Sequence, residues 1–70
     1  MDSSEFRLKV GNRIKQLRQE AKMTQAEVAK KAGININYFA VIERGEVTTS
    51  VEKLKKIGDA LKVDISKIIG

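Results

Sequence analysis

Residues 25–44 of this chain, QAEVAKKAGININYFAVIER, contain two short segments with apolar residues at helical spacing on either side of Gly33. Immediately before them, Thr24 and Glu27 form a T-x-x-E pattern. In this pattern each side chain can accept a hydrogen bond from the other residue's backbone N–H at the start of a helix. The first segment is therefore predicted to be a helix that begins after Thr24.

The first of these helices has a narrow apolar side. Val28 and Ala32 lie four residues apart and share one face, and the small Ala29 allows a second helix to approach closely. Gly33 follows directly, and glycine adopts the left-handed backbone at a helix C-terminus without steric cost. The chain is expected to turn sharply at this point.

The second helix is expected to begin after Asn35, a favourable N-cap residue, and to end at Gly45. Phe39 and Ile42 form an i, i+3 apolar pair that is predicted to face inward. Two helices joined by a tight turn constitute a helix-turn-helix, whose second helix presents its outer side to the major groove of DNA. The residues predicted on that outer side are Asn35, Ile36, Asn37, Ala40, Val41 and Arg44.

TQAEVAKKAG at residues 24–33, followed by IERG at 42–45, resembles the lambda-repressor-like helix-turn-helix family of phage and bacterial repressors, the xenobiotic-response-element type. The similarity covers about residues 10–69, nearly the whole chain. The short length and NYFAVIERG at 37–45 further resemble stand-alone regulators, including the controller proteins of restriction-modification systems. The resemblance implies an all-α domain of five helices that binds double-stranded DNA as a homodimer and regulates transcription, as a repressor.

Composition agrees with one small DNA-binding domain over residues 1–70. A chain of 70 residues buries only about 60% of its unfolded surface, so its core must be small. It has no cysteine and no histidine, so the commonest metal ligands and the commonest general base are missing. We expect no enzyme activity and no metal, cofactor or small-molecule ligand.

The charge of +5 favours a polyanionic partner, although it would also suit a membrane surface or simple solubility. The sequence has no run of about 18 apolar residues. Its start, MDSSEF, has neither the basic region nor the apolar segment of a signal peptide. We therefore expect a cytoplasmic protein that does not enter a membrane.

The segments that flank the motif have helical patterns of their own. Asp2 or Ser4 can cap a first helix, whose inward side is predicted to carry Phe6, Val10, Ile14, Leu17 and Ala21. After the EVTTS loop at 46–50, Thr49 and Glu52 form a second T-x-x-E pattern. The helix that it opens is predicted to bury Val51, Leu54, Ile57 and Leu61. Asp64 can cap a last short helix, and no strand-like alternation occurs.

Contacts to the DNA backbone set affinity and register, whereas contacts to base edges set sequence preference. Gln25 is the first phosphate candidate, because helix N-termini point N–H groups at anions and the family uses a glutamine here. The other phosphate candidates are Tyr38, Arg44, Thr48 and Thr49. Alternatively, the two threonines only shape a loop and cap a helix, and Tyr38 lines the edge of the core.

Asn37 is the best candidate for reading a base, since an amide can pair with N6 and N7 of adenine. Asn35 is more suited to capping. Ile36 and Val41 stand where many relatives carry hydrogen-bonding side chains, and we expect them to touch thymine methyl groups. The alternative is that Ile36 packs beside Tyr38 and reads nothing.

The resemblance also implies an ion pair between Arg18 and Glu43, which would link the first helix to the recognition helix. Such a pair would hold the recognition helix at its angle to the rest of the domain. The lysines at 53, 55 and 56 are interpreted as a solvated helix face rather than a second DNA contact.

The C-terminal residues suggest a dimer surface. Four large aliphatic residues fall within seven positions: Val63, Ile65, Ile68 and Ile69. If some of them are exposed on a monomer, a two-fold dimer would cover them and set two recognition helices about 34 Å apart on a roughly palindromic site. The alternative is that they close the monomer core and that dimers form only on DNA.

A competing class is a small protein-interaction module, such as an antitoxin-like adaptor, because fold alone does not determine function. Ile36, Ala40 and Val41 favour it, since they make the recognition helix unusually apolar. The polar or basic residues at 35, 37 and 44 favour DNA. Binding that weakens steeply with salt would indicate DNA, whereas an apolar protein contact should respond little.

Overall fold

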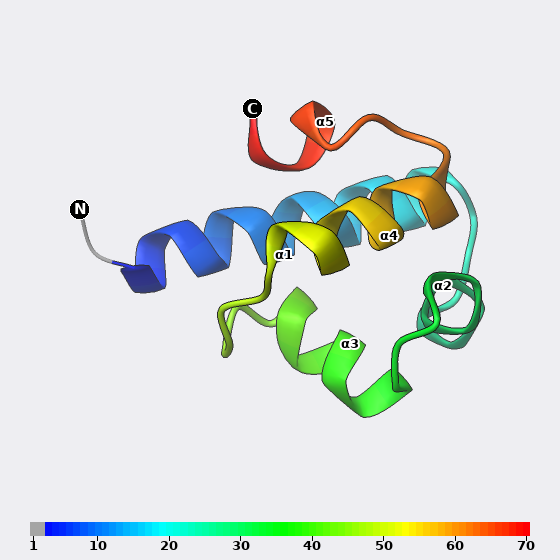
Figure 1. The fold of residues 1–70 in the computed structure, drawn as a ribbon, viewed down its shortest axis with the longest axis horizontal. Helices are drawn as coiled ribbons and strands as arrows, with labels where there is room; N and C mark the ends of the chain where they lie inside the picture. The colour runs from blue at the N-terminus through cyan, green and yellow to red at the C-terminus, as the bar shows by residue number, and fades with distance from the viewer. Residues whose placement is uncertain (1–2) are drawn as a thin grey trace.

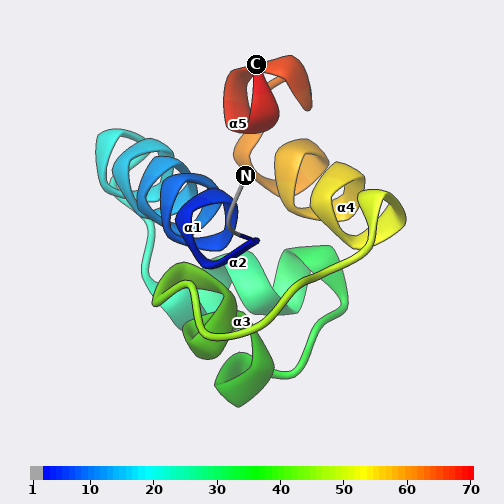
Figure 2. The same ribbon diagram turned by 90° about the vertical axis from the view of Figure 1, so that its left-hand side faces the viewer.

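Five α-helices make up the regular structure of residues 3–70, the part of the chain that the computed structural model describes. In both views α5 lies above α1 and α4, and the α2–α3 pair lies below them (Figures 1 and 2). The all-α prediction is confirmed. The helices are α1 (Ser3–Glu20), α2 (Gln25–Ala32), α3 (Ile36–Glu43), α4 (Val51–Leu61) and α5 (Ser66–Ile69).

The core lies where α1, α2, α3 and α4 converge, and α5 closes it over α1. Phe39 of α3 is the largest fully buried side chain, and its predicted partner Ile42 is buried with it. The predicted inward residues of α2 are also buried. The buried apolar residues are Val10, Ile14, Val28, Ala29, Ala32, Phe39, Ile42, Leu54, Ile57, Ala60, Leu61 and Ile68.

Side-chain caps start the helices of the motif as predicted. The Thr24 hydroxyl accepts from the backbone N–H of Glu27 at 3.0 Å, and the Glu27 carboxylate accepts from that of Thr24 at 2.8 Å. The hydrogen bond from the Thr24 backbone to the Glu27 carboxylate, followed by a contribution from the Thr24 side chain, lowers the pKa of Glu27. The side chain of Asn35 accepts from the N–H groups of Asn37 and Tyr38, at 2.8 and 3.3 Å.

The predicted cap of α4 is wrong by one residue. Ser50, not Thr49, accepts the backbone N–H of Lys53, at 3.1 Å. The Thr49 hydroxyl accepts from the Tyr38 hydroxyl instead, at 3.4 Å. Because α4 begins at Val51, that side chain points out of the fold and is 68% exposed, contrary to its predicted burial.

The ends of the first four helices share one geometry. A residue with a left-handed backbone follows the last turn of each helix. Its N–H donates to the carbonyl three positions earlier, and the N–H of the following residue donates to the carbonyl five positions earlier. After α3, for example, Gly45 N–H donates to Ile42 and Glu46 N–H donates to Val41, both at 3.0 Å. This is the Schellman motif. The left-handed residues are Lys22, Gly33, Gly45 and Lys62.

Three details of the first helix differ from the sequence-based expectations. Ser4 lies inside α1 rather than at its cap, and Asp2 lies outside the described residues. Phe6 is 43% exposed, because this end of α1 extends past the apolar core. Ala21 is exposed because α1 has already ended at Glu20.

The C-terminal segment closes the monomer core, so the predicted dimer patch needs correction. Ile68 is only 2% exposed, and Val63 and Ile65 pack against the core with partial exposure. Only Ile69 is classed as exposed, at 39%. The Arg13 guanidinium secures α5 by donating to the Lys67 carbonyl at 2.8 Å. A buried Ile68 cannot be an exposed interface residue.

Asp64 stands two positions before Ser66, the first residue of α5. Its carboxylate accepts the Ser66 N–H at 2.9 Å, which supplies the predicted capping bond, and this bond lowers the pKa of Asp64. Within the described residues, no helix is both long enough and apolar enough to span a bilayer.

Candidate nucleic-acid interface

The outer side of α3 is open to solvent. Asn35, Ile36 and Asn37 at its start are exposed, and Arg44 after its last turn is exposed as well. Ile36 is 44% exposed. Ala40 and Val41 are partly exposed. The helix therefore presents a mixed apolar and polar surface.

Three charged or polar side chains join the helices beneath this surface. Arg18 of α1 donates to both Glu43 carboxylate oxygens, from Nε at 2.5 Å and from Nη2 at 3.2 Å. Gln25 of α2 donates its amide to Oε1 of the same carboxylate at 2.9 Å. The side chains of Arg18 and Glu43 are 13% and 3% exposed. The predicted ion pair is present. Gln25, the predicted phosphate residue, is hydrogen-bonded to its carboxylate.

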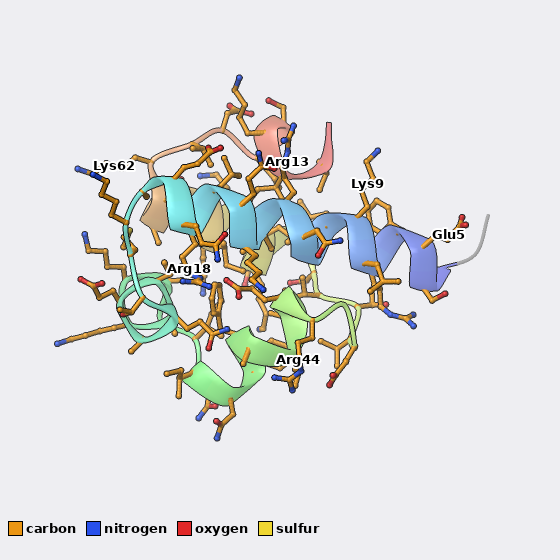
Figure 3. The ribbon with its side chains drawn as sticks, turned by 180° about the vertical axis from the view of Figure 1, so that it is seen from behind. Glu5, Lys9, Arg13, Arg18, Arg44 and Lys62 are labelled. Carbon is orange, nitrogen blue, oxygen red and sulfur yellow. The ribbon has the colours of Figure 1, made fainter. Side chains whose placement is uncertain are left out.

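Arg18 makes one further contact, from Nη1 to the Met23 carbonyl at 2.9 Å. One guanidinium thus ties the end of α3 to α1 and to the α1–α2 connection. In Figure 3, Arg18 lies on the side of α1 that faces α2 and α3, whereas Arg44 points away from α1 at the end of α3. Arg18 is therefore mostly buried between the helices, whereas Arg44 lies on the surface.

Sequence reasoning missed Gly11, where α1 and α3 meet. A Cβ on Gly11 would lie 2.4 Å from the Glu43 carbonyl oxygen and 2.6 Å from that of Ile42. Glycine is therefore required for the end of α3 to rest on α1. A single sequence carries little signal for this, because the glycine sits within an otherwise regular amphipathic helix.

Gly45, just after α3, also lies close to the backbone of α1. It has φ of 74°, and its added Cβ would lie 2.8 Å from the Leu8 Cα. Arg7 donates from Nε to the Gly45 carbonyl at 3.3 Å. The end of α3 is therefore held on α1 by two close backbone approaches and a hydrogen bond.

Tyr38 lines the edge of the core, one of the two roles that the sequence left open. Its ring is partly buried against the core, while its hydroxyl donates to Thr49. The Lys53 ammonium lies 6.0 Å from the centre of the ring. Lys55 and Lys56 are exposed, and Lys55 forms a surface ion pair with Asp59 at 3.3 Å. Lys53 thus differs from Lys55 and Lys56 because its ammonium faces a residue of α3.

Arg44 is paired with Glu46 two residues later. Its Nε donates to Oε2 at 2.7 Å and its Nη2 donates to Oε1 at 3.3 Å. The side chains are 56% and 54% exposed. The hydrogen bonds between them, followed by their charge attraction, raise the pKa of Arg44. The same hydrogen bonds lower the pKa of Glu46.

A groove between α1, the start of α2 and the end of α3 brings two of the predicted phosphate residues together. Thr48 is exposed but lies elsewhere, at a small apolar pocket with Phe6 and Val47. Within the described residues, no cluster of three acidic side chains could hold a metal. The groove is lined by Asn12, Lys15, Arg18, Gln25, Glu43, Arg44 and Glu46.

The family model described as helix-turn-helix matches residues 14–68. The chain belongs to the helix-turn-helix family. This membership agrees with the resemblance found in the motif at 24–45. The matched region includes α2 to α4, the C-terminal part of α1 from residue 14, and most of α5.

Two repressors are among its relatives. The immunity repressor protein of Bacillus phage phi105 is 41% identical over 61 residues, which cover 87% of this chain and 42% of that protein. The cryptic phage CTXphi transcriptional repressor RstR of Vibrio cholerae is 33% identical over 63 residues, covering 90% and 56%. The chain spans about half the length of the curated relatives it matches.

Solved structures confirm the fold. The restriction-modification controller protein C.AhdI from Aeromonas hydrophila superposes with a TM-score of 0.87 at 26% identity. The match covers 89% of this chain and 94% of the controller protein.

Proposed function

We propose that this domain binds double-stranded DNA in a sequence-specific manner and represses transcription. The observation that carries the proposal is the open outer side of α3, where exposed Asn37 and Ile36 stand at the start of the second helix of the motif. The family membership and the two repressor relatives support it. The net charge of +5 suits a polyanionic partner.

The proposed backbone contacts flank α3. Gln25 is the first residue of α2, where free N–H groups favour a phosphate. Arg44 follows the last turn of α3 and carries a charge, while Tyr38 and Thr48 add hydroxyl donors. The hydrogen bond from Gln25 to Glu43 supports this role, because it fixes the glutamine relative to α3.

The proposed base contacts come from the exposed turn of α3. Asn37 donates to and accepts from adenine, and Ile36 and Val41 contact thymine methyl groups. Asn35 positions these residues, since its own side-chain oxygen caps the helix. Replacing thymine by uracil at each site position should weaken binding where a methyl group is touched. Unchanged affinity at every position would exclude methyl contact.

We further propose that the domain acts as a homodimer on a roughly palindromic operator. The eight residues of α3 form a helix about 12 Å long, which covers only about three to four base pairs. One copy therefore reads too little sequence to single out an operator, and two copies on successive major grooves read twice as much.

Selection from a random-duplex pool at near-physiological salt, followed by sequencing, tests the function. We expect enrichment of a two-fold symmetric motif, and Asn37→Ala should lose base preference at one position in each half-site. Uniform retention would reduce the protein to a non-specific binder. Absence of retention, together with capture of a protein partner that resists salt, would favour the adaptor class instead.

A further inference from the structure

The surface pair Arg44–Glu46 lies on the groove that Gln25 also lines. We propose that Glu46 competes with DNA phosphate for Arg44: its carboxylate holds the guanidinium in the unbound protein and must be displaced when DNA binds. The inference rests on the proposed function, because it takes Arg44 as a backbone contact. It assigns to Glu46 the role of limiting affinity for DNA of any sequence.

The geometry of the pair resembles that of an arginine bound to phosphate. Two N–H groups on one side of the guanidinium fork, Nε and Nη2, each donate to one carboxylate oxygen. Arginine binds carboxylate and phosphate through this same two-point arrangement. One edge of the fork therefore cannot hold the carboxylate and a phosphate at the same time.

The backbone holds Glu46 in reach of Arg44 before any ligand arrives. Glu46 is the residue after left-handed Gly45, and its N–H donates to the Val41 carbonyl at 3.0 Å. The Schellman turn at the end of α3 thus sets both side chains on the same short segment. Because the backbone of both residues is already ordered, only side-chain entropy is lost when the pair forms, and the carboxylate is in place to compete with a phosphate.

The pair is exchangeable, unlike the other arginine–glutamate pair on the groove. Arg18 and Glu43 are nearly buried and also bind Gln25 and Met23, so a phosphate cannot replace that carboxylate. Arg44 and Glu46 are both more than half exposed. Exposed pairs contribute little to stability, and the turn has its own backbone hydrogen bonds. Loss of Glu46 should therefore change DNA binding more than folding.

The expected effect is on sequence-independent affinity. Glu46→Gln removes the competing charge, so a mixed-sequence duplex should bind about two- to fivefold more tightly at low salt, the range expected for one exposed pair. The slope of log affinity against log salt should steepen by less than about 0.9, the value for a whole phosphate contact, because Arg44 meets the same phosphate in both proteins. Affinity for an operator relative to mixed sequence should fall or stay level.

Fluorescence anisotropy with a labelled mixed-sequence duplex measures these affinities for the wild type, Glu46→Gln, Arg44→Gln and the double variant. If Glu46 acts through Arg44, the gain from Glu46→Gln must largely vanish in the Arg44→Gln background. An equal gain in both backgrounds would overturn the inference. Thermal melts of each variant verify that it is folded.

A matched control separates a local effect from net charge. Asp59→Asn removes one acidic group from another exposed ion pair, the one with Lys55 on α4, and raises the net charge by the same amount. If Asp59→Asn tightens binding as much as Glu46→Gln, the effect is general electrostatics and the inference fails. Failure of wild-type protein to bind any duplex would instead refute the proposed function itself.

Discussion

Gly11→Ala should destabilise the domain even though it replaces a helical glycine by the best helix former. In an open helix this change gains about 1 kcal/mol. Here the new methyl group would lie 2.4 and 2.6 Å from two carbonyl oxygens of α3, where ordinary contacts are 3.4 Å or more. Both obstacles are backbone atoms and cannot rotate away.

The magnitude follows from these two opposing effects. Overpacking costs about 1 to 3 kcal/mol, and a clash with backbone belongs at the upper end of that range. Subtracting the helix-propensity gain leaves a net loss of about 2 kcal/mol. For a domain of this size, such a loss lowers the melting temperature by about 8 to 16 °C.

Chemical and thermal unfolding of wild type, Gly11→Ala and Asn12→Ala provide the measurement. Asn12 is exposed on α1, so its replacement reports the propensity gain alone and should raise stability slightly. At a temperature where all three are folded, Gly11→Ala should also weaken DNA binding, because α3 must move. A Gly11→Ala protein as stable as wild type would refute the close α1–α3 approach.

Three further outcomes are expected. Arg18→Met should lower the free energy of unfolding, measured by denaturant titration, by about 3 kcal/mol, since it leaves the Glu43 carboxylate buried with Gln25 as its one remaining donor. The double variant Arg18→Met, Glu43→Met should recover much of this loss. Lys62→Gly should raise stability by about 0.5 to 1 kcal/mol in thermal melts, because Lys62 has φ of 60°; an unchanged or lower melting temperature would contradict this strain. The pKa of Glu27 is lowered from 4.5, so its contribution to stability is present above that pH and is lost as pH falls through the folded-state pKa. Glu27→Gln should therefore flatten the acid side of the stability–pH curve, and an unaltered curve would exclude this carboxylate as a cause.

The helix-turn-helix core was predictable because its signals are local. The Thr24–Glu27 box and the Asn35 cap each bond a side chain to backbone two or three residues away. Gly33 takes a left-handed φ that its own lack of a side chain permits. Phe39 and Ile42 face inward because helical spacing alone puts them on one side. Such interactions depend on neighbouring residues, so they can be inferred without a fold.

The sequence could not show whether Ser50 or Thr49 caps α4, since both residues carry a hydroxyl and both stand next to the start of the helix. The choice depends on Tyr38, eleven residues earlier, whose hydroxyl donates to Thr49. Ile68 was equally ambiguous, because an apolar residue near a terminus suits either a core or an interface. Its burial depends on how α5 folds back over α1.

The sequence by itself determined the helices, the turn at Gly33 and which side of α3 faces outward, because these follow from spacing and from bonds between near neighbours. The resemblance carried by the motif supplied the pairing of Arg18 with Glu43. Only the tertiary structure decided that Gly11 must be glycine and that Gln25 joins the buried pair. The physical reason is distance along the chain. Contacts between residues far apart in sequence, such as Gly11 with Glu43, exist only once α1 and α3 are packed together.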